Sequence, residues 1–129
     1  MRLLFGHEDV DVNFRDSRRR TPLSWAGWYG QEALVQLLLE DQNIDVDSRD
    51  RHDRTPLSWA AENRCYAVIQ LLLKNKDVDV NFKDDRDGTP LLWARRNGHG
   101  AVVRLLLEHE DADINLKDRY GQTLWDCTH

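Results

Sequence analysis

Dense apolar segments recur along the chain at a fixed spacing. The segments at 35–39, 69–73 and 103–107 each hold four apolar residues and one polar residue, and each starts 34 residues after the previous one. Apolar side chains at this density do not suit a helix with a water-facing side, so we expect short helices packed between neighbours on both sides. The pattern predicts an array of repeats that each contribute one such helix.

A second motif with the same period marks the start of another helix. Thr-Pro-Leu-Ser-Trp-Ala occurs at 21–26 and at 55–60, and Thr-Pro-Leu-Leu-Trp-Ala follows at 89–94. A Thr hydroxyl can accept a hydrogen bond from an amide of the first helical turn, and Pro lacks an N–H that would have no partner there. Gly30 and Gly98 suit the left-handed residue that ends a helix. Each repeat is therefore predicted to contain two short helices.

The polar segments between repeats show a brief alternation of apolar and polar residues. Val78, Val80 and Phe82 are separated by single polar residues. This pattern favours a short hairpin-like connector between one helix pair and the next.

These motifs together resemble the ankyrin repeat family, whose units of about 33 residues carry a Thr-Pro-Leu-His-x-Ala signature. The resemblance implies an all-α fold, a solenoid of stacked helix pairs with short β-hairpin-like fingers, in a single domain over 1–129. Full repeats are expected at about 16–49, 50–83 and 84–117, with partial repeats at 1–15 and 118–129. Ser-Trp after the signature Leu, and one extra residue after the leucine run, are closest in style to fungal ankyrin arrays found with NTPase domains.

Two departures from the family pattern concern the backbone. Members of the family usually have Gly at the fingertip, two residues before the signature Thr, where this chain has Arg19, Asp53 and Asp87. Asp tolerates a left-handed backbone better than Arg does, so the first fingertip is expected to be strained or differently shaped. Arg64 also replaces the glycine between the two helices of the second repeat, and we expect Asn63 to take the left-handed conformation instead.

Composition and the chain ends limit the number of domains and the expected cellular location. The 129 residues are 40% hydrophobic and 32% charged, as in one globular domain. No apolar run reaches membrane-spanning length, so no membrane partner is expected and the location is predicted to be intracellular, cytoplasmic or nuclear. The incomplete repeats at both ends indicate a fragment of a longer array or makeshift caps, and their apolar residues would favour self-association.

Candidate catalytic and metal-binding residues are sparse. Similar acidic clusters at 7–9 and 109–111 lie three periods apart, which favours solvated connectors. No His or Cys pair has the spacing of a zinc site, and no glycine-flanked nucleophile or phosphate-binding loop is present. We therefore predict that the chain is not an enzyme and uses no cofactor or metal.

The aromatic residues divide into recurring and unique positions. Trp25, Trp59 and Trp93 recur at one position, which favours packing between repeats over a binding ladder. Trp28 and Tyr29 occur in the first repeat alone, at first-helix positions that face the concave binding surface in the resembled family. They are either an anchor for a partner or packing at the end of the array.

The contact positions habitual in the family define a candidate partner-binding set: Arg18, Arg20, Trp28, Tyr29, Arg51, His52, Arg54, Glu62, Arg86, Arg96 and Tyr120. Arginines dominate this set although the chain carries a net charge of −5, so an acidic protein or peptide is the favoured partner. Alternatively, the finger aspartates neutralise the arginines, although the resemblance implies that backbone hydrogen bonds occupy those aspartates. Nucleic acid is disfavoured because no continuous basic stripe is present.

Two functions remain open at this point. The first is a non-catalytic protein–protein interaction module that binds through the concave surface of fingers and first helices. The second is a structural spacer array from a larger multidomain protein.

Overall fold

The computed structural model describes residues 12–109 and 111–113. Within that part the chain forms six helices and no strand: α2 (Pro22–Tyr29), α3 (Glu32–Leu39), α4 (Pro56–Glu62), α5 (Tyr66–Leu73), α6 (Pro90–Arg96) and α7 (Gly100–Leu107). The helix pairs follow the predicted period, which confirms an all-α repeat solenoid. No helix of the described residues is long and apolar enough to cross a lipid bilayer.

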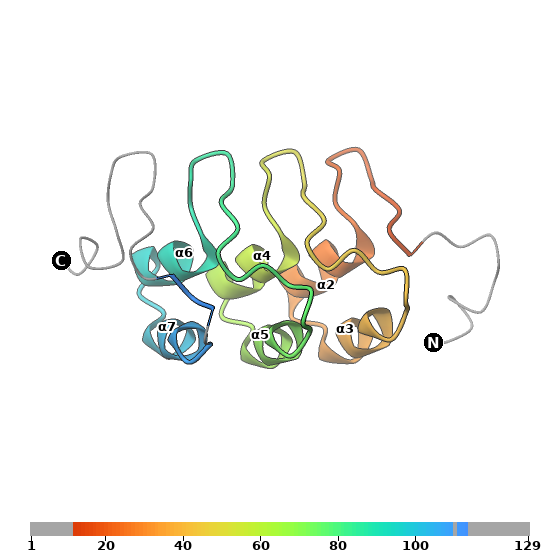
Figure 1. Cartoon of the computed structure of the whole chain (residues 1–129). Helices are drawn as coiled ribbons and strands as arrows, with labels where there is room; N and C mark the ends of the chain where they lie inside the picture. Colours follow the sequence, from red (N-terminus) through yellow and green to blue (C-terminus); the bar gives the residue numbers. More distant parts are fainter. Residues whose placement is uncertain (1–11, 110, 114–129) are drawn as a thin grey trace.

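The helices form two rows, with the loops between repeats projecting on one side (Figure 1). The first helices of the repeats, α2, α4 and α6, lie side by side, and α3, α5 and α7 form the second row below them. The core runs between the rows. Leu38, Leu72 and Leu106 from the second helices are fully buried in it. Burial of each such leucine stabilises the fold by about 1.5–3 kcal/mol relative to an exposed side chain. Because one core cluster contains residues of all three repeats, each repeat depends on its neighbours for this burial.

The three Thr-Pro dipeptides start the first helices as predicted. The Thr hydroxyl accepts a hydrogen bond from the amide three residues later, at 3.2 Å for Thr21, 3.3 Å for Thr55 and 3.2 Å for Thr89. A bond of this kind stabilises a helix by roughly 1 kcal/mol. The signature residues therefore fix where each first helix begins.

The turn between the two helices needs one left-handed residue at a fixed position. Gly30 has a φ of 68° and Gly98 has a φ of 73°, and in the second repeat it is Arg64, with a φ of 58°, that matches them. Asn63 has a φ of −97°, so the prediction that it takes the left-handed conformation was wrong. The position is fixed because the next amide, of Cys65, donates to Ala60 O at 3.0 Å, as the equivalent amides do in the other repeats.

The fingertips share one conformation. Arg19, Asp53 and Asp87 have φ angles of 61°, 59° and 60°. The predicted alternative that the first fingertip differs in shape from the others was therefore wrong. The strain remains, since a left-handed backbone is less favourable for Arg than for Asp.

Asparagine side chains fasten successive connectors to one another. Asn13 donates from Nδ2 to Asn43 O at 2.7 Å and accepts at Oδ1 from the Asp45 amide at 2.9 Å. Two periods later, Asn81 makes the same two bonds to the next connector, at 2.6 and 2.7 Å. At the equivalent position one period after Asn13 and one period before Asn81, the chain has Asp47 in place of asparagine.

Candidate functional site

Each finger is anchored by its first aspartate. The fingers are the hairpin-like segments at 16–20, 50–54 and 84–88, in which the Asp amide donates to the carbonyl four residues later. The Asp Oδ1 atom accepts from two amides of its own finger at 2.8–3.1 Å. These bonds confirm that Asp16, Asp50 and Asp84 are occupied by the backbone. The amide of Arg20 is the main cause of the lowered pKa of Asp16.

The recurring tryptophans complete this anchor. The second carboxylate oxygen, Oδ2, accepts from the indole Nε1 of the tryptophan nine residues later, at 2.8 Å for Trp25, 2.8 Å for Trp59 and 2.6 Å for Trp93. Each finger is thereby fastened to the helix that follows it. The recurrence of tryptophan thus has a structural cause: it both packs and donates a hydrogen bond.

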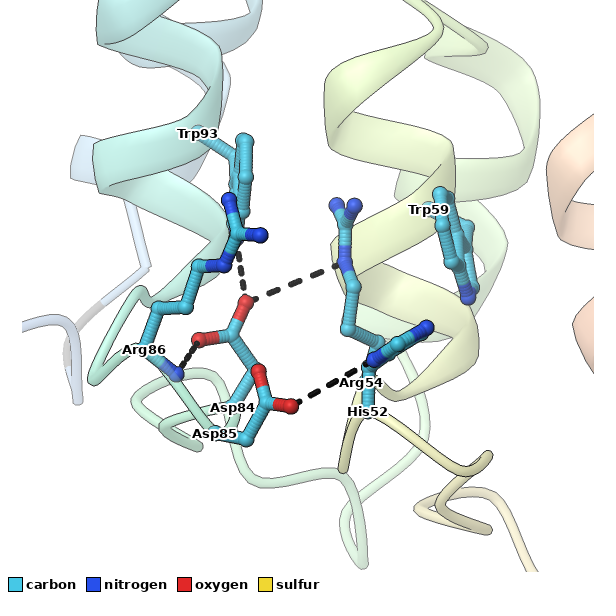
Figure 2. A pocket seen from close by; sticks show the side chains of 7 residues that line it. All are labelled: His52, Arg54, Trp59, Asp84, Asp85, Arg86 and Trp93. Atoms are coloured by element: carbon cyan, nitrogen blue, oxygen red, sulfur yellow. Dashed lines mark hydrogen bonds and ion pairs between the residues drawn. The ribbon is translucent and has the colours of Figure 1, made fainter.

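Arg54 is enclosed between two of these tryptophans (Figure 2). Its guanidinium carbon lies 3.7 Å from the ring centroid of Trp59 and 4.2 Å from that of Trp93. Nε donates to Ser58 Oγ at 3.0 Å, Nη2 donates to Ser58 O at 3.2 Å, and Nη1 pairs with Glu62. The residue is 6% exposed, and this burial lowers its pKa. Arg54 and Glu62, both in the predicted partner-binding set, therefore lie in the packing between the second and third repeats.

Arg20 occupies the same position in the first finger but has different neighbours. Its guanidinium carbon lies 4.8 Å from the ring centroid of Trp25, 4.6 Å from that of Trp28 and 5.1 Å from that of Trp59. Its Nε forms an ion pair with Asp50 Oδ2 at 3.8 Å, too long for a hydrogen bond, as Arg54 Nε does with Asp84 Oδ2 at 3.9 Å. Arg20 is 9% exposed. It too belongs to a stack in which tryptophan rings and guanidinium groups alternate, and not to the open surface.

The other predicted residues lie mainly at the surface. Arg18, Arg51, His52, Arg86 and Arg96 are exposed. Tyr29 is 63% exposed and stacks on Trp25 with ring centroids 5.7 Å apart, whereas Trp28 is half-buried against Trp59. Tyr120 lies outside the described residues, as do the whole C-terminal partial repeat and residues 1–11 of the N-terminal one, both proposed to self-associate.

Backbone hydrogen bonds join neighbouring fingertips. The Arg51 amide donates to Arg18 O at 3.2 Å, and the Asp85 amide donates to His52 O at 3.0 Å. His52 and Asp85 also approach through their side chains, with 3.4 Å between Nδ1 and Oδ2 (Figure 2). The tips therefore form one continuous surface. We call residues 17–19, 51–53 and 85–87 the fingertip surface.

A small pocket opens between the second and third fingers. Its volume is about 180 Å³, below the roughly 300 Å³ at which drug-sized ligand sites begin. It is lined by His52, Arg54, Trp59, Asp84, Asp85, Arg86 and Trp93 (Figure 2). The candidate set missed four of these residues. Two are Trp59 and Trp93, which occupy the same position in successive first helices, and two are Asp84 and Asp85 of the third finger. The size suits one side chain of a partner better than a small-molecule substrate.

The charge of the fingertip surface changes along the array. With histidine neutral, the tips at 17–19, 51–53 and 85–87 carry charges of +2, 0 and −1. The basic tip belongs to the first repeat, which also carries the exposed ring of Tyr29; that ring stacks on Trp25, the donor to Asp16 at the base of the same finger. Among the described residues, no group of three or more His, Cys, Asp and Glu side chains could hold a metal ion. The chemistry available at this surface is charge pairing and aromatic contact.

Two family models match the chain. Residues 1–84 match a model described as ankyrin repeats (3 copies), and residues 87–119 match a model described as ankyrin repeat. A comparison with curated proteins found no matching relative. The matches give no support to the narrower similarity to fungal arrays found with NTPase domains.

Proposed function

Because this chain belongs to the ankyrin repeat family, whose members generally act as protein–protein interaction modules, we propose that it is a non-catalytic module that binds an acidic segment of a partner protein. The fingertip surface makes the contact. The acidic residues of the partner lie over the first and second fingers, next to Tyr29. The proposal includes an intracellular setting, cytoplasmic or nuclear.

The charge gradient of the fingertip surface carries this proposal. Arg18 and Arg51 are exposed, and the finger aspartates beneath them are occupied by their own backbone and by tryptophan. An exposed ion pair contributes about 0.2–1 kcal/mol, so several pairs around an aromatic anchor are needed for useful affinity. Opposite charge on the partner also speeds its association. Nucleic acid is a poorer match, because the tips change sign along the array.

The test compares two charge-reversal double variants as baits for affinity capture. Arg18→Glu with Arg51→Glu reverses the basic end of the fingertip surface. Lys74→Glu with Arg104→Glu makes the same change of charge at exposed positions at the end of α5 and on α7. We expect the first variant to lose a partner with an acidic segment and the second to retain it. If both variants retain every partner, the array is better described as a structural spacer.

A further inference from the structure

The fingertips meet at two junctions that share one backbone contact and differ in side-chain charge. Between the second and third tips, the Asp85 amide donates to His52 O at 3.0 Å, and the two side chains approach to 3.4 Å between Nδ1 and Oδ2. Between the first and second tips, the Arg51 amide donates to Arg18 O at 3.2 Å. By the 34-residue period Arg18 occupies the position of His52. Arg51 likewise occupies the position of Asp85, so the first junction has two arginines where the second has a base and an acid.

The two arginines of the first junction lie on neighbouring tips without an acid to neutralise them. The tips share one backbone conformation, so the side chains of Arg18 and Arg51 start from the positions at which the side chains of the second junction meet. Both arginines are exposed, and neither side chain has a hydrogen bond or ion pair with another residue of the described part of the chain. The aspartates at the bases of these two fingers already accept backbone amides and a tryptophan. Two neighbouring cations repel each other, and an anion between them relieves this repulsion.

The net charge also distinguishes the two junctions. The tips at 17–19 and 51–53 carry +2 and 0 with histidine neutral, so the first junction has a charge of +2. The tip at 85–87 carries −1, so the second junction has a charge of −1. A compact anion is therefore attracted to the first junction and repelled from the second.

From these contrasts we infer that Arg18 and Arg51 form a clamp for a phosphorylated side chain of the partner protein. The inference rests on the proposed function and names the acidic group that the partner presents. A phosphorylated side chain carries about −1.5 to −2 charges at pH 7 and three strong acceptor oxygens, which is enough for paired hydrogen bonds from two guanidinium groups. A carboxylate has less charge and fewer acceptor atoms to share between them. An anionic membrane surface matches less well, because the acidic third tip belongs to the same fingertip surface as the clamp.

The first experiment titrates the protein with three peptides and follows its backbone amides by NMR. The peptides are acetylated and amidated Gly-Gly-X-Gly-Gly, in which X is phosphoserine, Glu or Ser. We expect the phosphoserine peptide to shift the amides of 17–19 and 51–53 in a saturable manner. It should bind about tenfold more tightly than the Glu peptide, the effect of one additional charged hydrogen bond. Equal affinities for these two peptides would overturn the clamp.

Substitutions at Arg51 test whether the first junction causes the preference for phosphate. Arg51→Asp gives this junction the pairing of the second and is expected to reduce phosphoserine binding to the level of the Ser peptide. Arg51→Lys keeps the charge but loses the paired N–H donors, so its affinity should lie between those of the wild type and Arg51→Asp. Both variants keep the contact with Arg18 O, which is a backbone bond.

The matched control is Lys74→Asp, which makes the same change of charge at an exposed position at the end of α5. It is expected to bind the phosphoserine peptide like the wild type. An equal loss of affinity in Lys74→Asp and Arg51→Asp would indicate general attraction between charges and would overturn the clamp.

The outcomes separate the clamp from the proposed function. If the phosphoserine and Glu peptides shift the same fingertip amides with equal affinity, the clamp is wrong and an acidic partner segment stands. If neither peptide shifts the fingertip amides, both proposals fail. Vesicles of phosphatidylcholine with a phosphoinositide provide the lipid comparison. Binding to these vesicles that Arg51→Asp removes, without binding of the phosphoserine peptide, would replace the phosphorylated protein by a membrane surface and overturn the inference.

Discussion

The indole of Trp59 donates a hydrogen bond to Asp50 Oδ2 at 2.8 Å, and the same carboxylate receives two backbone amides at Oδ1. One aspartate therefore shapes its finger and fastens that finger to the next helix. Asp50 is 3% exposed, so its carboxylate depends on these donors and not on water.

Removal of the indole donor should destabilise the array. In Trp59→Phe the aromatic packing is largely kept, but Asp50 Oδ2 loses its hydrogen-bond donor, at a cost of about 1–3 kcal/mol, and retains the longer ion pair with Arg20. Urea unfolding measures the loss. A double-mutant cycle with Asp50→Ala should show coupling between the two sites, and strictly additive effects would refute the assigned bond.

Asp47 should make the stability of the protein depend on pH. It occupies the position of Asn13 and Asn81 and accepts from the Asp79 amide at 2.9 Å through Oδ2, but its Oδ1 is buried without a partner. In Asn13 and Asn81 the amide Nδ2 takes the place of this Oδ1 atom and donates to a carbonyl of the next connector. A charged carboxylate has no proton to donate there.

The sign of the effect follows from the pKa of Asp47. Burial is the main cause that raises this pKa from 3.8 to about 6, and the nearby Asp79, Asp45 and Asp77 add to it. The folded state thus binds the proton more tightly than the unfolded state does. Stability should fall as pH rises from about 4 to about 6 and stay low above that range.

Asp47→Asn tests this effect. It should stabilise the protein at pH 7 and flatten the dependence of the melting temperature on pH, since Asn can donate where Asp⁻ cannot. The reciprocal change, Asn81→Asp, should introduce a second loss of stability over the same pH range. A wild-type melting temperature that rises between pH 4 and 6, together with no gain in Asp47→Asn at pH 7, would contradict the assignment.

Arg64→Gly should stabilise the second repeat. Arg64 has a φ of 58°, and a left-handed backbone costs a residue with a side chain roughly 1 kcal/mol that glycine avoids. The matched control is Asn63→Gly one residue earlier, where φ is −97° and glycine brings no relief. Equal melting temperatures for the two variants would count against this account of the turn.

The period located the structural elements well because local chemistry decides them. A Thr-Pro dipeptide caps a helix through its own hydroxyl, so Thr55 and its equivalents could be read from the sequence alone. The left-handed residue of the second repeat was wrongly predicted to be Asn63, because its place is decided by the geometry of the whole turn and not by one residue's preference. A hydrogen bond between Cys65 and Ala60, which spans the turn, outweighs the intrinsic preference of Asn63.

The site was harder to predict because long side chains respond to neighbouring repeats. Arg20 and Arg54 belong to a residue type that is usually exposed, and their burial depends on tryptophans of their own and the following repeat. The period did contain one signal, since Glu62 lies eight residues after Arg54 and Trp28 lies eight after Arg20. Which side-chain atoms come into contact across that spacing depends on the side-chain directions, and the period of the sequence does not predict these.

Arg54→Ala should separate stability from binding. It empties the space between two tryptophans and removes the hydrogen bonds to Ser58 and the ion pair with the partly exposed Glu62, and hydrogen bonds of a charged group contribute about 1.5–3 kcal/mol. Arg18→Ala, at an exposed tip, should change the free energy of unfolding by less than about 0.5 kcal/mol. Chemical denaturation compares the two variants, and equal losses would contradict the division between packing and surface arginines.

The affinity of a purified acidic partner for the two charge-reversal double variants, measured by calorimetry at low and high salt, tests the central claim most directly. The account predicts that Lys74→Glu with Arg104→Glu binds like the wild type and weakens with salt, whereas Arg18→Glu with Arg51→Glu loses most of the affinity at low salt. Equal affinities for the two double variants, with no dependence on salt, would contradict recognition by the fingertip surface.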